Sequence, residues 1–358
     1  MKPRRHSCRL LPPMGLAVLS LLVVACAQTV SNPTAIVRPA SYPLLAASET
    51  SSCTARGRLV HCWGSSNEMF PDTARQVGHS PQTGLGRFGN FTSHRQFDAP
   101  IERLLAGSAS FAILDSGRTL HWLGMRFRFP FNPPMSSVDD ISIPPMGVCW
   151  ASGGHFQCQM LDSTPDIQAH FSDDDFHRYG LSSLRLGGHA GFVRRGSSVY
   201  LWHYSLREGR TIERVRDVFS GYNRACFIME SDRIECIGVI PGLGEHPMLP
   251  SGVVPVRFAQ HVHGTSVCFI DSQGGVWCGG ENGYGELGQG HSRAVEGFVR
   301  VPLPEPVERL TTGVSHAVAV LRSGRIFAWG LNVLGQVDPT SSAPHLPLVD
   351  VSRFAPPP

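Results

Sequence analysis

Cysteine spacing is the feature of this chain that most directly indicates chemistry. Of its ten cysteines, Cys8 lies close to the start and Cys26 has no near neighbour in the sequence. The remaining eight form four pairs whose members are nine or ten positions apart: Cys53/Cys62, Cys149/Cys158, Cys226/Cys236 and Cys268/Cys278. Zinc knuckles place two to four residues between their cysteines, so this spacing does not match a zinc site.

Each cysteine pair brackets a turn. Gly153-Gly154 lies midway between one pair, and Gln273 lies midway between another. A hairpin turn of two or three residues would set the paired cysteines opposite each other, with Cα atoms about 4.5 Å apart, within the range of a disulfide. We predict four disulfides, with reduced thiols in a core as the alternative. Four disulfides would require an oxidising compartment.

Two further clusters contain side chains that can bind metals. The run Ser172–His177 has three consecutive aspartates but lacks the spacing, Gly and terminal Glu of a calcium loop. His261 and His263 would share one face of a strand, with no third ligand close in sequence. We interpret the first as a solvated loop and the second as polar residues at a strand edge. The sequence therefore predicts no metal site and no cofactor.

Motifs for covalent catalysis and phosphate binding are absent from the sequence. The chain contains no G-x-S-x-G, no S-x-x-K and no G-x-x-x-x-G-K-[ST]. Lys2 is the only lysine, and export would remove it, so an exported form has no amine for Schiff-base chemistry. We predict that the protein has no catalytic residues and is not an enzyme.

The elements that must position the cysteines are β-hairpins. Ser266–Gly288 and Ser315–Val337 each contain an apolar run, a polar turn with Gly, a second apolar run that ends in Gly, and a Gly-rich tail. Seven such hairpins can be aligned between Trp63 and Trp329, which gives about 44 residues per unit. That is the length of one four-stranded blade of a β-propeller.

The tail of the repeat carries a family resemblance. Apolar–polar–Gly–apolar–Trp-Gly followed by N-x-x-G-[QE]-L-G resembles the repeat of the RCC1 family (regulator of chromosome condensation), most clearly at Glu281–Gly288 and Leu331–Gln336. The resemblance implies an all-β, seven-bladed β-propeller over residues 42–352, with 353–358 as a tail. The bracketing cysteines make the chain similar to the exported bacterial branch of this family.

The repeat leads to two further expectations, one about how the two ends of the propeller meet and one about the units that lack a cysteine pair. His345–Val351 resembles the strand that begins other units, and the first unit starts at Tyr42 without one, so we expect this C-terminal strand to pair with the first blade. In the second and seventh units we expect the pairs Phe111/His121 and Val318/Ala328 to pack where other units carry cysteines.

The N-terminal segment has the composition of an export signal. Residues 1–25 combine four basic residues with the apolar run Met14–Ala25, which is too short to span a bilayer. Val23–Cys26 resembles a lipobox, so we expect lipidation at Cys26 and a tether over 26–41; a plain signal peptide is the alternative. Removing residues 1–25 turns the net charge of +3 into −1, which opposes nucleic-acid binding.

Long connections between hairpins carry the residues expected to bind a partner. Such connections are rich in aromatic and arginine side chains, the usual anchors of protein interfaces: Phe88, Phe91, Arg126, Phe127, Arg128 and Phe129. The alternative for 125–131 is an extended strand whose phenylalanines pack inward. We expect a monomeric, noncatalytic propeller, anchored at the outer membrane or cell surface or else periplasmic or secreted, that binds a protein or a glycan.

Two other functions compete with this interpretation. Bacterial RCC1-like propellers include a β-lactamase inhibitor, so the resemblance also allows a secreted inhibitor of a hydrolase. The role of the eukaryotic family, nucleotide exchange on a small GTPase, is opposed by the export signal, the cysteine pairs and the charge near neutrality.

Overall fold

In the computed structural model the chain is divided into two units, Met1–Pro39 and Ala40–Pro358. The structure describes most of the second unit and none of residues 1–41, so Cys26 and the lipobox lie outside the described residues. The described ranges are 42–65, 70–77, 90–124, 134–143, 147–160, 171–181, 184–186, 190–203, 209–221, 224–238, 240–261 and 264–357. No helix within these ranges is long and apolar enough to cross a membrane.

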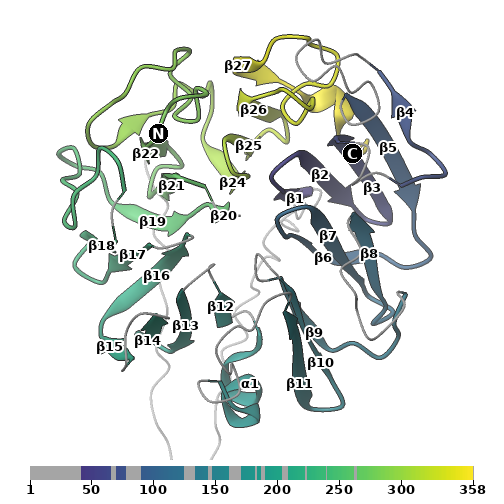
Figure 1. The fold of residues 1–358 in the computed structure, drawn as a ribbon, viewed down its shortest axis with the longest axis horizontal. Helices are drawn as coiled ribbons and strands as arrows, with labels where there is room; N and C mark the ends of the chain where they lie inside the picture. Colours follow the sequence, from purple (N-terminus) through teal and green to yellow (C-terminus); the bar gives the residue numbers. More distant parts are fainter. Residues whose placement is uncertain are drawn as a thin grey trace, which may run out of the picture. The chain divides into compact units, whose positions relative to one another are not determined.

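The described residues form seven sheets of three to five strands, which follow one another around a common centre (Figure 1). We number the sheets in chain order. Their strands, given in the order in which they hydrogen-bond, are as follows. Sheet 1 contains β1 (Leu44–Ala47), β2 (Ser51–Arg56), β3 (Leu59–Gly64), β5 (Phe91–Gln96) and β4 (Arg75–Gln76); sheet 2 contains β6 (Ile101–Ala106), β7 (Ser110–Asp115) and β8 (Leu120–Gly124); sheet 3 contains β9 (Asp140–Ser142), β10 (Gly147–Ser152) and β11 (His155–Met160).

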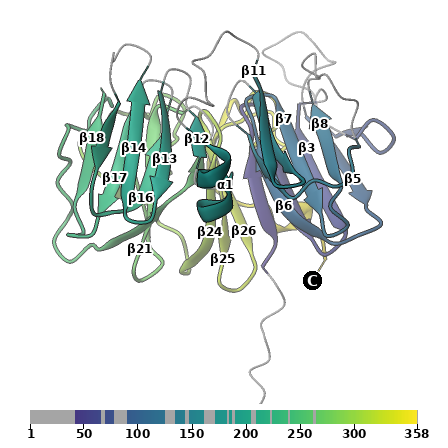
Figure 2. The ribbon, with the colours of Figure 1, turned by 90° about the horizontal axis from the view of Figure 1, so that it is seen from below.

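The second half of the chain forms the other four sheets. Sheet 4 contains β12 (Leu184–Leu186), β13 (Ala190–Arg195), β14 (Ser198–His203) and β15 (Arg210–Ile212); sheet 5 contains β16 (Val215–Ser220), β17 (Ala225–Met229) and β18 (Ile234–Ile237); sheet 6 contains β19 (Pro255–Phe258), β21 (Ser266–Asp271), β22 (Val276–Gly280) and β23 (Val299–Arg300); sheet 7 contains β20 (Gln260–His261), β24 (Val307–Thr312), β25 (His316–Leu321), β26 (Ile326–Leu331) and β27 (His345–Asp350). Two short helices are added, α1 (Asp173–Tyr179) and the 3₁₀-helix Ser352–Phe354. Figure 2 shows the sheets standing side by side, with α1 against their outer side.

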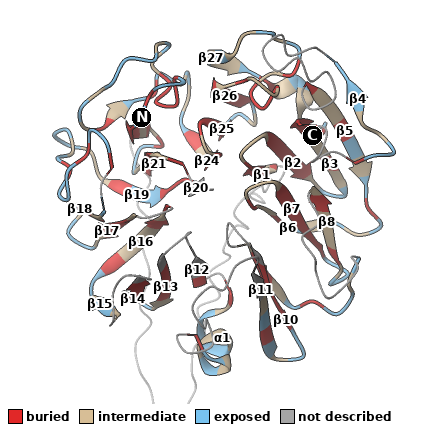
Figure 3. Cartoon of the chain, in the orientation of Figure 1, coloured by how far each residue is buried: buried red, intermediate tan, exposed pale blue. Residues whose placement is uncertain are grey.

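Central strands are buried on both faces, which explains their apolar composition. In β21, Cys268 and Ile270 face the cluster shared with sheet 7, whereas Val267 and Phe269 face the cluster shared with sheet 5. Successive side chains of a strand point to opposite faces, so one strand supplies two interfaces. Figure 3 shows this burial in central strands such as β7 and β25, in which every residue is buried.

Seven apolar clusters join the sheets, and each draws its buried residues from two sheets that are neighbours in the chain, with one exception. The exception joins the two ends: Leu45 and Trp63 of sheet 1 pack with Val318, Val320 and residues of β26 in sheet 7. The first and last sheets therefore lie side by side.

The prediction that the C-terminal strand completes the first blade is wrong. β27 pairs antiparallel with β26 inside sheet 7, with Ala328 opposite Val349. Sheet 1 has its own first strand, because β1 pairs with β2 and sets Ala46 opposite Cys53. The ends are joined by packing and hydrogen bonds between two sheets rather than by a shared strand.

The Gly that ends most of the hairpins has a steric reason. Gly330 has φ 103°, and a Cβ at this position would collide with the carbonyl oxygen of Ser315, at the start of the same hairpin. Gly280 has φ 113° and would collide in the same way with Thr265. The Gly of the motif is required because the chain that enters the hairpin passes directly over it.

Two smaller expectations change. Ser172 caps a helix of seven residues, Asp173–Tyr179, through a reciprocal capping box with Asp175, so this run is a helix rather than a loop. In sheet 2, Phe111 lies opposite Leu123 and His121 lies opposite Ile113, so the expected pairing of Phe111 with His121 is wrong by two positions. Val318 does lie opposite Ala328, as predicted.

Candidate partner-binding site

The cysteine pairs form four disulfides, as their spacing predicts. Each joins directly opposed positions of a hairpin, with Cα–Cα distances of 4.1 Å for Cys53–Cys62, 4.0 Å for Cys149–Cys158, 4.1 Å for Cys226–Cys236 and 4.1 Å for Cys268–Cys278. Gly153 and Gly154 form the predicted two-residue turn, both with positive φ. The disulfides hold hairpins inside the scaffold and indicate an oxidising, exported location.

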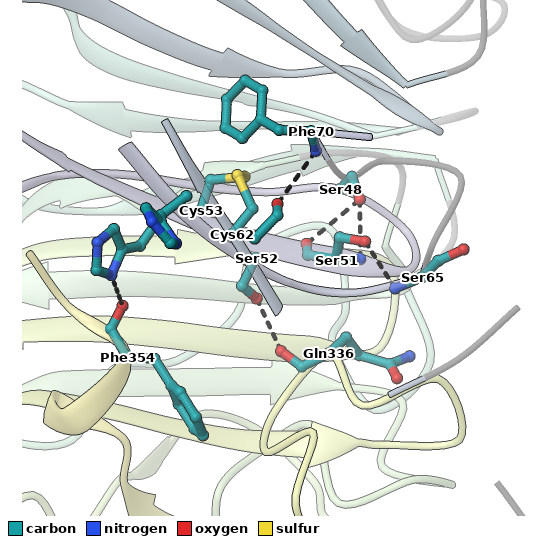
Figure 4. Close-up of a disulfide and its surroundings, with 12 residues drawn as sticks. Ser48, Ser51, Ser52, Cys53, Cys62, Ser65, Phe70, Gln336 and Phe354 are labelled. Atoms are coloured by element: carbon teal, nitrogen blue, oxygen red, sulfur yellow. Dashed lines mark hydrogen bonds between the residues drawn. A yellow bond between two sulfur atoms is a disulfide. The ribbon is translucent and has the colours of Figure 1, made fainter. Parts of the chain in front are cut away.

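A buried serine–histidine contact joins the two ends of the chain. Ser52 Oγ lies 3.0 Å from His316 Nε2. It donates a hydrogen bond of 2.8 Å to the carbonyl oxygen of Gln336 (Figure 4). Burial lowers the pKa of His316 to about 3, so the ring is neutral. The hydroxyl proton is already donated, and Nδ1 of His316 has no hydrogen-bond partner among the described residues. This pair therefore lacks the orienting carboxylate and the accessible hydroxyl of a catalytic dyad and acts as a link between sheets.

The acidic run near α1 is occupied by internal contacts. The pKa of Asp173 is lowered, first by its hydrogen bond with His155 at 2.9 Å. Asp175 binds Arg195 at 2.6 Å. Within the part of the chain that the structure describes, no group of three or more His, Cys, Asp or Glu side chains could hold a metal ion. His261 lies in β20, which pairs in parallel with β24, and His263 lies outside the described residues.

Most of the residues expected to bind a partner lie outside the described residues: Phe88, Arg126, Phe127, Arg128 and Phe129. Phe91 is described. It lies in β5 opposite Gly64 and packs, half-buried, against the apolar cluster between sheets 1 and 2. Its ring contributes to the core contact of sheet 1.

The most exposed large apolar side chain of the described residues is Met248, with 88% of its surface exposed. The next, Tyr284, is 49% exposed. Met248 lies in the connection between β18 and β19, within Pro247-Met248-Leu249-Pro250. It borders an open pocket of about 470 Å³ between this connection and the one that joins β22 to β23. The sequence interpretation missed this segment, although an uncharged apolar run between prolines in a connection was the available signal.

The Met248 segment is fixed on both sides of the exposed residue. Pro247 is buried, and Leu249 packs against the cluster between sheets 5 and 6. Upstream, the backbone carbonyl oxygen of Glu245 accepts a hydrogen bond of 2.7 Å from the backbone nitrogen of Cys236. Gly297, on the opposite wall of the pocket, donates to Gly242 at 2.9 Å. The backbone thus holds Met248 outward without relying on contacts of the Met248 side chain.

The rim of the pocket combines apolar and charged groups. Leu243 and Pro247 line it and are buried, whereas His246 and Glu296 are exposed. Small apolar surfaces with a few polar groups at the rim are typical of sites that receive a partner's side chain.

Comparison with known proteins agrees with the repeat seen in the sequence. The family model described as Regulator of chromosome condensation (RCC1) repeat matches residues 307–336, which contain β24, β25, β26 and the exit loop after them. Three structures illustrate the similarity. The ectodomain of a Physcomitrella patens receptor kinase is 15% identical, with a TM-score of 0.51, over 81% of this chain and 73% of that chain. The CRINKLY WD40 ectodomain of an Arabidopsis thaliana receptor kinase is 16% identical, with a TM-score of 0.50, over 85% and 98%.

The third similar structure is Prp20p of Saccharomyces cerevisiae, which is 14% identical, with a TM-score of 0.47, over 86% of this chain and 76% of that chain. At these identities the two plant ectodomains show a shared fold and nothing further. The chain is therefore an all-β protein of propeller type that carries the RCC1 repeat.

Proposed function

We propose that this RCC1-repeat protein is a noncatalytic, exported propeller that binds another protein through the loop around Met248. The observation that carries the proposal is the 88% exposure of Met248 on a backbone held by Pro247 and Leu249. A flexible thioether suits an irregular partner surface, and a fixed backbone reduces the entropy lost on binding.

The scaffold supports this proposal. We infer that the seven sheets are the blades of one closed ring, because each of the seven apolar clusters joins two sheets and one of them joins the first sheet to the last. A ring of this kind leaves its inter-sheet loops to vary without loss of the core. The Met248 loop is one of these, between sheets 5 and 6.

The four disulfides support export, and we propose lipidation at Cys26 as the means of anchoring at the outer membrane or cell surface. Both plant structures that share the fold are ectodomains, which agrees with an extracellular position. Labelling with palmitate should mark the wild-type protein and not the Cys26→Ser variant. Equal labelling of both would contradict the anchor, and labelling of neither would favour a plain signal peptide.

Photocrosslinking tests the binding site. A photoreactive amino acid at position 248 should crosslink one envelope or extracellular protein, and the same group at Val256, an exposed apolar control that is 39% exposed, should not. Burying a methionine contributes about 1.5–3 kcal/mol, so Met248→Asp should weaken binding of the captured protein at least about tenfold, while Val256→Asp leaves it unchanged. Equal crosslinking at both positions, or unchanged affinity in Met248→Asp, would reject the site.

The identity of the captured protein separates the competing functions. If it is a hydrolase that the purified propeller inhibits at a one-to-one ratio, the protein is an inhibitor. If capture is abolished by deglycosylating the extract, the ligand is a glycan rather than a protein surface. A nucleotide-exchange role would require acceleration of nucleotide release from a small GTPase.

A further inference from the structure

Two histidines lie directly opposite each other on sheet 1. His61 is in β3, His94 is in β5, and the antiparallel register pairs them. Their ring centroids are 5.5 Å apart, with an angle of 52° between the ring planes. The two histidines lie in different segments of the chain, 33 positions apart in sequence, so no local sequence motif predicts that they meet.

The separation of the two rings matches a shared metal ion. Side chains at directly opposed strand positions have Cβ atoms about 4.5–5.5 Å apart, which lets two imidazoles converge. A tetrahedral centre with metal–nitrogen distances of about 2.1 Å would place two ring centroids about 5 Å apart. The observed centroid distance of 5.5 Å is therefore compatible with both rings binding one ion.

A backbone contact already selects the nitrogen that would bind. Nδ1 of His61 lies 3.2 Å from the carbonyl oxygen of Phe354 (Figure 4, at Phe354). A carbonyl oxygen only accepts, so Nδ1 carries the proton and Nε2 keeps its lone pair. A histidine that binds a metal usually donates its other N–H in this way.

The arginines near the two histidines are paired with carboxylates. Asp72 interacts electrostatically with His94, although its carboxylate is bound to Arg95 at 2.8 Å. The guanidinium of Arg353 lies 4.6 Å from the Phe354 ring and pairs with Asp338. Both cations near the pair are thus neutralised by carboxylates.

We propose that His61 and His94 bind one divalent transition-metal ion of the type that prefers imidazole, such as Cu²⁺, Ni²⁺ or Zn²⁺. In the described part of the chain no third protein ligand accompanies them, so the other coordination positions belong to water or to a ligand from outside the chain. Because His61 also holds Phe354, a bound ion would fasten the C-terminal 3₁₀-helix to sheet 1.

Titration of the untagged, disulfide-bonded protein with CuCl₂ tests the site. We expect Cu²⁺ to bind with a two-nitrogen signature in electron paramagnetic resonance and to bind more tightly than Ni²⁺, with Mn²⁺ weakest. His94→Ala should weaken Cu²⁺ binding at least about tenfold and leave a one-nitrogen signature at the remaining ligand. His94 is exposed, so this variant should fold normally.

The control is His155→Ala, which removes a histidine that is 77% exposed and lies on sheet 3. It should leave Cu²⁺ binding unchanged, and His61→Ala should behave as His94→Ala does. The proposal is overturned if His94→Ala binds Cu²⁺ with the wild-type affinity and signature, or if His155→Ala weakens binding as much as His94→Ala.

Discussion

The repeat places a tryptophan against the exit loop of the preceding unit, and this contact occurs twice with one difference. Trp329 Nε1 donates to the carbonyl oxygen of Glu286 at 2.8 Å, and Trp63 Nε1 donates to the carbonyl oxygen of Gln336 at 3.0 Å. Both tryptophans are fully buried. The first contact joins sheets 6 and 7, and the second joins the last sheet to the first.

The two contacts differ in what remains when the indole N–H is removed. The oxygen of Gln336 also accepts from Ser52, whereas that of Glu286 accepts from no other described group. Replacing either tryptophan by phenylalanine removes a similar volume. Trp329→Phe additionally leaves a buried acceptor unpaired, which costs about 1–3 kcal/mol, so it should destabilise the protein by about 1–2 kcal/mol more than Trp63→Phe.

Equilibrium urea unfolding of the oxidised protein, followed by far-ultraviolet circular dichroism, measures both variants, with equal m-values as the condition for comparing them. Adding Ser52→Ala to Trp63→Phe removes both donors to Gln336. The double variant should then lose at least about 1 kcal/mol more than the sum of the two single variants. A Trp63→Phe loss equal to that of Trp329→Phe, or strict additivity in the double variant, would refute this reasoning.

Two further predictions concern the scaffold. A disulfide that closes a loop with a sequence separation of 10 stabilises the folded protein by about 2.7 kcal/mol through chain entropy. The double variant Cys268→Val with Cys278→Ala copies the Val318/Ala328 pair, so it should lose no more than this amount and remain folded in urea titrations. A loss above about 5 kcal/mol would show that the two pairs are not equivalent. The pKa of His316 is about 3 in the folded protein and near its ordinary 6.5 in the unfolded chain, which therefore binds one more proton between these values. Protonation of His316 in the unfolded chain should therefore lower the free energy of unfolding by about 1.4 kcal/mol for each unit that the pH falls below 6.5. The difference in unfolding free energy between wild type and His316→Gln, measured at pH 7, 6 and 5, should follow this slope; a constant difference would contradict the prediction.

The hairpins and their disulfides could be predicted because they are local. Gly153-Gly154 fixes a two-residue turn, and the turn fixes which cysteines face each other. The same reasoning located Val318 opposite Ala328. The prediction failed at Phe111, where alignment with the cysteine-bearing units gave His121 as the partner, two positions away from the true partner, Leu123. Register follows from the turn only where the turn length is known.

Contacts between distant segments could not be predicted from one sequence. The C-terminal strand has the composition of any strand, and its pairing with β26 rather than with sheet 1 depends on which edges the folded sheets leave open. That Met248 is exposed while Pro247 is buried and Leu249 half-buried is known only from the structure. His61 and His94 become a pair only through the register of β3 and β5.

The sequence by itself determined the repeat, the hairpin in each unit, the four cysteine pairs and the Gly that ends most of the hairpins. These depend on turn geometry and on contacts within about ten residues, which local composition specifies. The tertiary structure alone decided how the ends meet, that Ser52 and His316 link them, and which apolar side chain is left outward. Those outcomes depend on which surfaces of separate sheets are buried against each other, and burial between distant segments is a property of all the packed sheets together.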